Sequence, residues 1–194
     1  MVQRVLIPLA AGFEDLEAIT VIDLLRRAEI DVSVAGLDPG PVRGARGTTV
    51  VPDTTLAMVE QQDFDMVVLP GGQPGATNLE RDPRVARLLQ RHAAGGRYLA
   101  AICAAPRVLA SAGLLHGRRV TCFPGALEGV GGVRLQNQAV VVDGRVITSR
   151  GPGTALDFAL ELIHLLAGQE RRDAVERALQ RPTEHLLEQI PEWG

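Results

Sequence analysis

The sequence predicts an α/β protein built on a mostly parallel sheet, and three observations support that prediction. Apolar segments of strand length alternate with amphipathic segments of helix length, which is typical of parallel α/β sheets. Two of the apolar segments, 66–69 and 98–102, are short and uncharged, as strands buried inside a sheet are. Glycine directly follows the predicted helix 83–94, where a helix is expected to end.

Six elements are predicted in the first half of the chain from their apolar periods and flanking turn residues. They are a strand at 4–9, an amphipathic helix at 14–28, a strand at 31–35, an irregular antiparallel excursion at 42–51, a strand at 66–69 and a helix at 83–94. A glycine-rich loop, 70–75, follows the strand 66–69. Glycines in such a place let the backbone approach a ligand closely and expose N–H groups.

The second half of the chain continues the alternation and ends in a tail. Its predicted elements are a strand at 98–102, a helix from Pro106 to near Gly113, a strand at 119–123, a hairpin at 138–149, an apolar helix at 153–167, a polar helix at 170–179 and a tail at 182–194. In the tail, Leu186, Leu187 and Ile190 would dock as a short cap. The hairpin turns at Asp143-Gly144, a strong two-residue turn signal. Because no repeat or linker interrupts this order, we expect a single domain over residues 1–194.

Composition and charge exclude several functional classes. Of the 194 residues, 46% are hydrophobic and 22% are charged, and the formal net charge of −3 offers no basic field for nucleic acid. No apolar run approaches the length of a membrane span. Two cysteines and an N-terminus without a signal-peptide pattern predict a reduced, cytoplasmic protein. The four histidines are scattered without ligand spacing, so we expect no metal site and no cofactor.

Cys103 stands where the predicted strand 98–102 passes into the helix that begins at Pro106. This is the arrangement of a nucleophile elbow, in which a sharp turn presents one reactive atom above the edge of the sheet. The N–H groups at the start of the helix would favour the thiolate. The alternative is an inert core cysteine, the role that we expect for Cys122 inside the strand 119–123. We predict that Cys103 is reactive, in a thiol-dependent enzyme or a thiol sensor.

Glu17 lies at the centre of the apolar stripe of the helix 14–28, among Phe13, Val21 and Leu24. Burying an unpaired carboxylate is costly, so Glu17 is expected to hold a proton at a raised pKa and to donate a hydrogen bond. A glutamate that merely favours the helix dipole is the alternative. Beside a thiolate, a protonated glutamic acid would serve as a proton shuttle.

The loop 70–75 and the residue after Cys103 together predict an oxyanion hole. The N–H groups of Gly72 and Ala104, with Gly71 beside them, would stabilise negative charge on an attacked carbonyl oxygen. Alone, such a loop is a weak signal because turns are rich in glycine for steric reasons. Arg46, in the excursion 42–51, is a candidate contact for an anionic group, and a surface arginine is the alternative.

Four motifs are spaced along the chain in a specific order. They are Gly-Phe-Glu-Asp-Leu-Glu at 12–17, Leu-Pro-Gly-Gly at 69–72, Ala-Ile-Cys-Ala-Ala-Pro at 101–106 and Thr-Ser-Arg-Gly-Pro-Gly-Thr at 148–154. Together they resemble the ThiJ/PfpI superfamily, specifically the branch of the parkinsonism-associated deglycase and its bacterial relatives. The resemblance covers about residues 4–168 and leaves 169–194 as a C-terminal helix and tail.

The resemblance implies a flavodoxin-like three-layer sandwich and a homodimer with its first helix near the interface. Ile19 and Ile22, which point away from the Glu17 stripe, also predict a subunit contact. By the same resemblance, Cys103 would be the nucleophile on a strained elbow and Glu17 the protonated partner of its thiolate. Gly72 and Ala104 would supply the oxyanion-hole amides.

The chain departs from the superfamily pattern at informative positions. Phe123 stands where many members of the branch place a histidine near the cysteine, so no histidine base is expected. Ala104 replaces the histidine that follows the cysteine in peptidase members. Ala101 and Ala105 replace the glycines that flank the cysteine in glutamine-amidotransferase relatives. These departures make a cysteine peptidase or amidase the weakest functional interpretation.

Two functions fit the remaining residues. One is a glyoxalase or deglycase that needs no cofactor and converts methylglyoxal or glyoxal, or their adducts with amines, thiols or glycated macromolecules, to 2-hydroxy acids. The reaction would pass through a hemithioacetal on Cys103, with Glu17 as the proton shuttle. The other is a redox-sensing stress protein or chaperone in which Glu17 would hydrogen-bond an oxidised Cys103.

Overall fold

The computed structural model describes residues 2–181. Its main sheet contains β1 (Arg4–Leu9), β2 (Asp31–Gly36), β5 (Thr54–Thr55), β6 (Met66–Leu69), β7 (Tyr98–Ile102), β10 (Val140–Asp143) and β11 (Val146–Ser149). Its helices are α1 (Asp15–Arg27), α2 (Leu56–Val59), α3 (Gly75–Arg81), α4 (Pro83–Ala94), α5 (Pro106–Ser111) and α6 (Ala155–Ala178), with a 3₁₀ turn at Pro152–Thr154. Two short pairs lie outside the main sheet, β3 (Val42–Arg43) with β4 (Thr49–Val50) and β8 (Arg119–Val120) with β9 (Arg134–Leu135).

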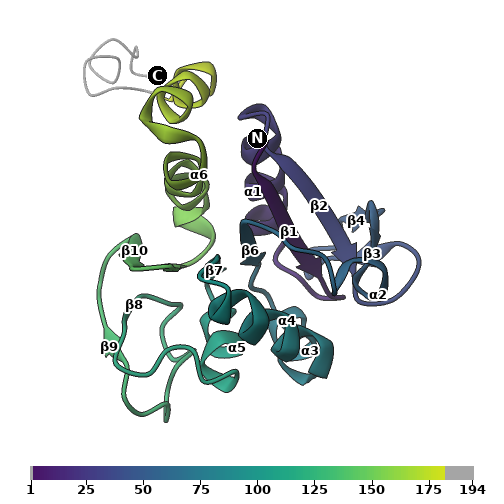
Figure 1. Cartoon of the computed structure of the whole chain (residues 1–194), viewed down its shortest axis with the longest axis vertical. Helices are drawn as coiled ribbons and strands as arrows, with labels where there is room; N and C mark the ends of the chain where they lie inside the picture. Colours follow the sequence, from purple (N-terminus) through teal and green to yellow (C-terminus); the bar gives the residue numbers. More distant parts are fainter. Residues whose placement is uncertain (1, 182–194) are drawn as a thin grey trace, which may run out of the picture.

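The main sheet has the order β10-β11-β7-β6-β1-β2-β5 (Figure 1). All neighbouring strands are parallel except β10 and β11, which form the predicted hairpin. Read from β2 to β11, the five central strands follow the order of flavodoxin-like sheets. The predicted fold class is therefore confirmed, and the carboxyl ends of β1, β6 and β7 lie at one edge of the sheet.

Strand side chains alternate between two hydrophobic cores, one on each face of the sheet. Val5, Ile7 and Leu9 of β1 pack into the core that α1 and α6 cover, whereas Leu6 packs into the core under α2, α3, α4 and α5. The residues of β6 alternate in the same way. Successive strand residues point to opposite faces, so apolar side chains on both faces require helices on both sides. The result is a three-layer sandwich.

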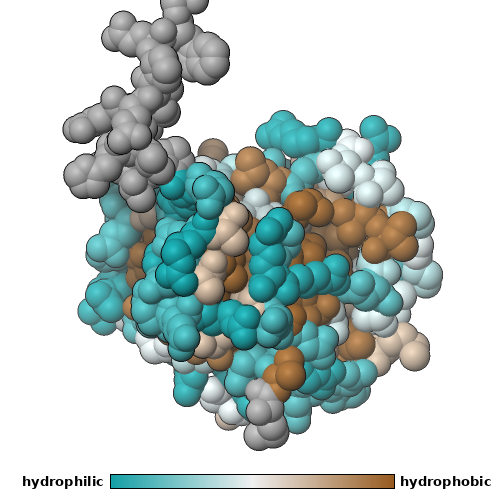
Figure 2. All heavy atoms as spheres, turned by 90° about the horizontal axis from the view of Figure 1, so that it is seen from above, coloured by the Kyte–Doolittle hydropathy of each residue, from teal (hydrophilic) through white to brown (hydrophobic). Residues whose placement is uncertain are grey.

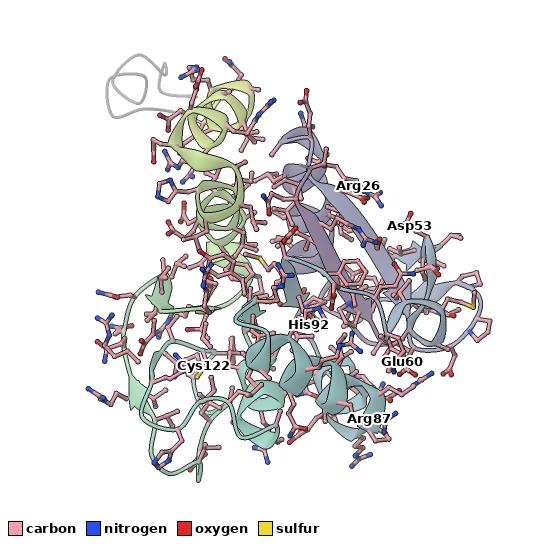
Figure 3. All side chains as sticks on the ribbon, viewed as in Figure 1. Arg26, Asp53, Glu60, Arg87, His92 and Cys122 are labelled. Carbon is pink, nitrogen blue, oxygen red and sulfur yellow. The ribbon has the colours of Figure 1, made fainter. Side chains whose placement is uncertain are left out.

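The predicted strand 119–123 is wrong in its length and its place. Only its first two residues form β8, which pairs with β9 outside the main sheet. The N–H of Thr121 donates to Oγ1 of Thr148 on β11, at 2.9 Å, instead of to a backbone carbonyl. Cys122 therefore lies beyond the strand, in the segment labelled in Figure 3.

Several short elements were not expected from the sequence. These are α2, α3, β5 and β9. The seven residues of α3 include Gly75, Thr77 and Asn78, which have low helix propensity, so local preference does not indicate a helix. Buried Ala76 and Leu79 anchor α3 by packing. Tertiary contacts therefore decide the structure of this segment.

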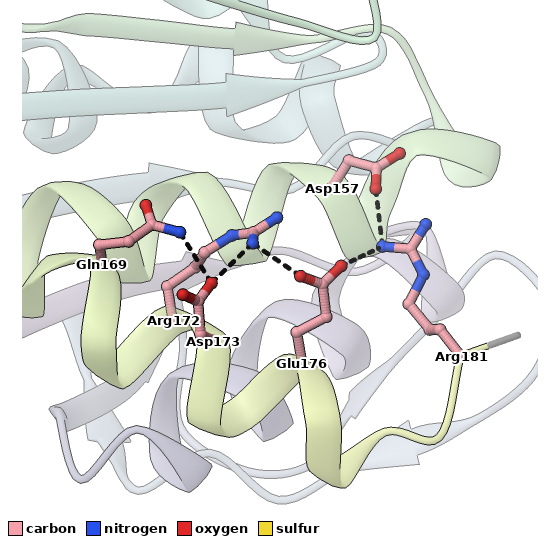
Figure 4. A network of polar contacts seen from close by, with 6 residues as sticks. All are labelled: Asp157, Gln169, Arg172, Asp173, Glu176 and Arg181. Carbon is pink, nitrogen blue, oxygen red and sulfur yellow. Dashed lines mark hydrogen bonds and ion pairs between the residues drawn. The ribbon is translucent and has the colours of Figure 1, made fainter. Parts of the chain in front are cut away.

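The helices predicted at 153–167 and 170–179 form the two parts of α6, which meet at Gly168. That residue has φ 84° and ψ 170°, far from helical values. The second part turns back beside the first, and Arg181 reaches Oδ1 of Asp157 at 2.9 Å (Figure 4). Glu176 links Arg181 and Arg172, which completes a polar network across the break. The predicted cap of Leu186, Leu187 and Ile190 lies outside the described residues.

One of the two isoleucines assigned to a subunit contact is buried in its own subunit. Ile22 is 9% exposed and packs in the core that α1 and α6 share, because α6 covers this side of α1. Ile19 remains 41% exposed, and Leu16, one turn earlier, is 51% exposed. Figure 2 shows hydrophobic side chains at the surface between hydrophilic ones on the face seen from above. No helix within residues 2–181 is long and apolar enough to cross a membrane.

Candidate active site

Cys103 directly follows β7 and adopts the strained conformation of the predicted elbow. Its φ of +64° lies in the left-handed region, which residues other than glycine seldom adopt. The N–H of Cys103 donates to the carbonyl of Ser149, and the N–H of Phe123 donates to the carbonyl of Cys103, both at 2.9 Å. These hydrogen bonds hold the backbone on both sides of the thiol. The residue is 9% exposed, so little of Cys103 is open to solvent.

Glu17 is fully buried on α1, as its place in the apolar stripe predicted. Its Oε2 accepts a hydrogen bond from the N–H of Gly71 at 2.9 Å. Its Oε1 is buried without a hydrogen-bond partner of good geometry among residues 2–181. Burial raises the pKa of Glu17 to about 7, and the negative charge of Glu14 adds to the rise. Hydrogen bonding with the Cys103 thiol and with Gly71 opposes it.

Gly71 packs against both Glu17 and Cys103 and leaves no room for a side chain. A Cβ atom added to Gly71 would lie 2.7 Å from Cβ of Cys103 and 2.7 Å from Oε2 of Glu17. Gly72 has φ +91°, and a Cβ atom there would collide with the backbone N of Glu14. Glycine at both positions is what lets the loop after β6 pack closely against the carboxyl, the thiol and the start of α1. The structure thus brings together residues that the sequence places on α1, after β6 and after β7.

The amides of Gly72 and Ala104 both act on the sulfur of Cys103. Each donates a hydrogen bond that lowers the pKa of the thiol. Burial, followed by the charge and hydrogen bonding of Glu17, outweighs them and raises the pKa of Cys103 to about 12. Both N–H groups are therefore directed at the sulfur, and the oxyanion hole remains a prediction.

The N–H groups at the turn favour the Cys103 thiolate, as expected, but burial and Glu17 outweigh them and raise the pKa of the thiol overall. The helix α5 begins three residues later, at Pro106, and the thiol is buried beside a carboxyl. Removing a thiolate from water and placing it next to a carboxylate both disfavour its charge. The charge of Glu17 raises the pKa of Cys103 only while the Glu17 carboxyl is ionised, so the two groups titrate as a pair.

The excursion that carries Arg46 is held against the site by Asp15. Both carboxylate oxygens of Asp15 accept backbone hydrogen bonds at 2.8 Å, from Arg46 and from Thr48. The sequence did not reveal this role, because an aspartate at the start of a helix is common for electrostatic reasons alone. The Arg46 guanidinium is 3.6 Å from Oε1 of Glu14, and its side chain is 75% exposed. Its contact with an anionic ligand remains a prediction.

The other thiol and the buried histidine have different surroundings. Cys122 lines a separate cavity of about 650 Å³ together with Arg150. His92 is buried, its Nε2 accepts the N–H of Phe64, and burial lowers the pKa of its imidazole (Figure 3). Within residues 2–181, no group of three or more histidine, cysteine, aspartate or glutamate side chains is placed to hold a metal ion.

Residues 3–165 match the model of the DJ-1/PfpI family. Protein dj-1beta of Drosophila melanogaster is 43% identical over 182 residues, which cover 92% of this chain and 97% of the relative. Its crystal structure superimposes with a TM-score of 0.91, with 42% identity over 94% of this chain and 100% of that chain.

The name of one further relative states an activity, and that of another states an oxidation state. Glutathione-independent glyoxalase DJR-1.2 of Caenorhabditis elegans is 38% identical over 168 residues, which cover 86% of this chain and 89% of the relative. A structure of oxidized DJ-1 from Toxoplasma gondii has a TM-score of 0.89 and 35% identity, and the match covers 93% of this chain and 100% of that chain.

Proposed function

Because the chain belongs to the DJ-1/PfpI family, we propose that it converts methylglyoxal or glyoxal, or their early adducts with amines and thiols, to 2-hydroxy acids without a cofactor. The observation that supports this most is the buried pair of Glu17 and Cys103, which are in contact with each other and both packed against Gly71. The relative named glutathione-independent glyoxalase supports the same chemistry.

The first step joins the sulfur to the aldehyde carbon. The carboxylate of Glu17 takes the proton of the Cys103 thiol as Sγ attacks, and the π electrons of the C=O bond move to the oxygen. The N–H groups of Gly72 and Ala104 stabilise that oxygen while it is negative. Glu17 then returns the proton to the oxygen, which gives a hemithioacetal and an ionised carboxylate.

The second step moves hydrogen within the substrate. The Glu17 carboxylate removes the proton from the former aldehyde carbon and delivers it to the neighbouring ketone carbon. The hydroxyl proton of the hemithioacetal passes to the ketone oxygen. The first carbon thereby becomes a thioester carbonyl and the second carries a hydroxyl, so oxidation and reduction balance inside one molecule. Water then cleaves the thioester, which releases lactate from methylglyoxal or glycolate from glyoxal and restores the thiol.

The pKa of Glu17 suits this alternation of roles. A group that accepts and donates a proton in one cycle works best when its pKa is near the working pH, because both forms are then available. Burial raises the pKa of Glu17 to about 7. An ordinary exposed glutamate would be a much weaker base at neutral pH.

An NMR time course of methylglyoxal without glutathione or added metal tests this function. Wild type and Cys122→Ala should both produce lactate, because Cys122 lines a separate cavity. Cys103→Ala and Glu17→Gln should each lose at least a hundredfold in rate, since neither the nucleophile nor the base can be replaced by a neighbour. Equal turnover in Cys103→Ala, or loss of methylglyoxal without lactate, would contradict the proposal.

Redox sensing is the second candidate, and the oxidized structure of the Toxoplasma gondii relative favours it. The carboxyl of Glu17 could donate a hydrogen bond to a sulfinate on Cys103. Mass spectrometry after graded peroxide treatment should then show an oxygen adduct at Cys103 before any at Cys122. Under this function Glu17→Gln changes the extent of oxidation, whereas lactate production is absent from wild type.

A further inference from the structure

Phe123 is a neighbour of Cys103 that the reaction steps above do not use. Its N–H donates to the carbonyl of Cys103 at 2.9 Å, which fixes the residue beside the nucleophile. Its side chain belongs to neither core and is 50% exposed. Exposing an aromatic ring to water is unfavourable, so this half-exposed ring, on a residue hydrogen-bonded to the backbone of the nucleophile, is an apolar surface open to a ligand.

The ring of Phe123 rests against the segment that follows β11. A Cβ atom added to Gly151 would lie 3.4 Å from Cδ2 of Phe123, so the ring and the glycine backbone are in contact range. Two residues before Gly151, the carbonyl of Ser149 accepts the N–H of Cys103. The backbone of Cys103 is thus hydrogen-bonded on one side to Phe123 and on the other to the segment on which the ring rests. The same backbone segments therefore position both the Phe123 ring and Cys103.

The other surroundings of the nucleophile are polar. Beside Ala104 the surface opens into a hollow of about 710 Å³ between α3 and α5. Its lining is mostly charged or hydrogen-bonding and includes Gln73, Thr77, Glu80, Arg81 and Arg107. Phe123 does not line this hollow. The surroundings of Cys103 thus include an apolar side chain, on a residue hydrogen-bonded to its backbone, and a polar hollow next to Ala104.

We propose that Phe123 determines substrate specificity by packing against the carbon substituent of an α-oxoaldehyde bound at Cys103. This inference rests on the proposed function and adds a preference to it. When the carbonyl oxygen accepts hydrogen bonds from the amides of Gly72 and Ala104, an alkyl substituent contacts the ring of Phe123. Glyoxal has no alkyl substituent and makes no such contact. The enzyme then favours alkyl-substituted α-oxoaldehydes over glyoxal.

The test compares kcat/KM for isobutylglyoxal and for glyoxal. Phe123→Ala should lower the ratio of the two values roughly threefold to tenfold, as expected for partial loss of an apolar contact. Phe123→Leu, which keeps an apolar side chain, should retain most of the ratio. Leu135→Ala is the matched control, because Leu135 is also exposed, at 59%, and lies in the same connection between β7 and β10. An unchanged ratio in Phe123→Ala would overturn the inference.

A second measurement separates this inference from the proposed function. Rates of Cys103 alkylation by iodoacetamide and by its N-benzyl derivative are followed by mass spectrometry, which requires no turnover. The preference for the benzyl reagent should fall in Phe123→Ala and persist in Leu135→Ala. If wild type makes no hydroxy acid but this preference falls, the reaction is wrong and the apolar contact stands. If wild type turns over and neither ratio changes, the role of Phe123 is wrong.

Discussion

Glu17 has two conflicting demands, because burial disfavours its ionised form while the proposed reaction requires it to accept a proton. The carboxyl is fully buried, and its hydrogen bonds with Gly71 and with the Cys103 thiol do not compensate a full charge. Its pKa rises to about 7 as a result. Cys103 has a similar conflict, because its φ of +64° is unfavourable for any residue with a Cβ atom. Both residues therefore reduce the stability of the fold that holds them.

Glu17→Gln should increase stability above neutral pH. The folded protein binds the Glu17 proton with a pKa of about 7, whereas in the unfolded chain this carboxyl has its ordinary pKa of 4.5. Folding therefore takes up a proton between these values, and the free energy of unfolding falls as the pH rises through them. Glutamine removes this loss, so the variant should be more stable by on the order of 2 kcal/mol above pH 7 and equal to wild type near pH 4.

Urea unfolding across this pH range checks the prediction. Glu14→Gln is the comparison, since Glu14 is at the same end of α1 but its side chain is partly exposed and ion-paired with Arg46. A Glu17→Gln variant that loses stability at every pH would show that the ionised carboxyl is well stabilised in the fold.

Cys103→Gly should be more stable than Cys103→Ala, by about 1 kcal/mol, because glycine adopts positive φ without a steric penalty. At Cys122, where φ is not positive, the order should reverse, since alanine restricts the unfolded chain. Chemical denaturation of the four variants measures both differences. The same order at both cysteines would indicate that the backbone at Cys103 relaxes once the thiol is gone.

At the scale of elements, α6 shows how one glycine positions a long helix. Its first part covers the sheet beside α1, and its second part returns along it after Gly168. The network of Asp157, Arg172, Glu176 and Arg181 is half-exposed, so its ion pairs contribute little stability. The turn therefore depends mainly on the backbone conformation of Gly168.

Gly168→Ala should destabilise the protein by roughly 1–3 kcal/mol, because φ 84° with ψ 170° is open almost only to glycine. Gly153→Ala is the control, since an added Cβ atom there meets nothing within 4 Å and φ is not positive. Thermal unfolding followed by circular dichroism compares the two. Equal melting temperatures would mean that the second part of α6 adds nothing to global stability.

At the scale of the whole molecule, α1 has one side in the core and one side partly open. Glu17 and Ile22 face inward, whereas Leu16 and Ile19 are exposed. Neighbouring exposed apolar side chains on a helix are typical of protein–protein contacts. A second copy of the chain meeting α1 would cover them without disturbing the site on its inner side.

We therefore expect a homodimer, with a mass by light scattering of twice the chain mass of 20.7 kDa. Ile19→Glu should shift the population to monomer, because dimerisation would bury its charge without a partner. Leu156→Glu is the control, as Leu156 is exposed to a similar degree, at 39%, on α6. A wild type that is monomeric at all practical concentrations would contradict this arrangement.

The sequence by itself determined the features that depend on short-range rules. Apolar period identified β1, β6, β7 and the α1 stripe, and it placed Glu17 in the core, because burial of a face repeats with the geometry of the element. The glycines and the order of the four motifs located the loop after β6 and singled out the cysteine after β7. These conclusions needed no knowledge of what lies across the sheet.

Only the tertiary structure decided the features that depend on contacts between distant segments. The strand 119–123 was shortened because the side chain of Thr148 takes the N–H of Thr121. Ile22 became buried because α6 covers it. The pKa of Cys103 rises instead of falling, since burial and Glu17, 86 positions earlier in the chain, outweigh the local amides. Each outcome is a balance of energies between groups that only folding brings within reach.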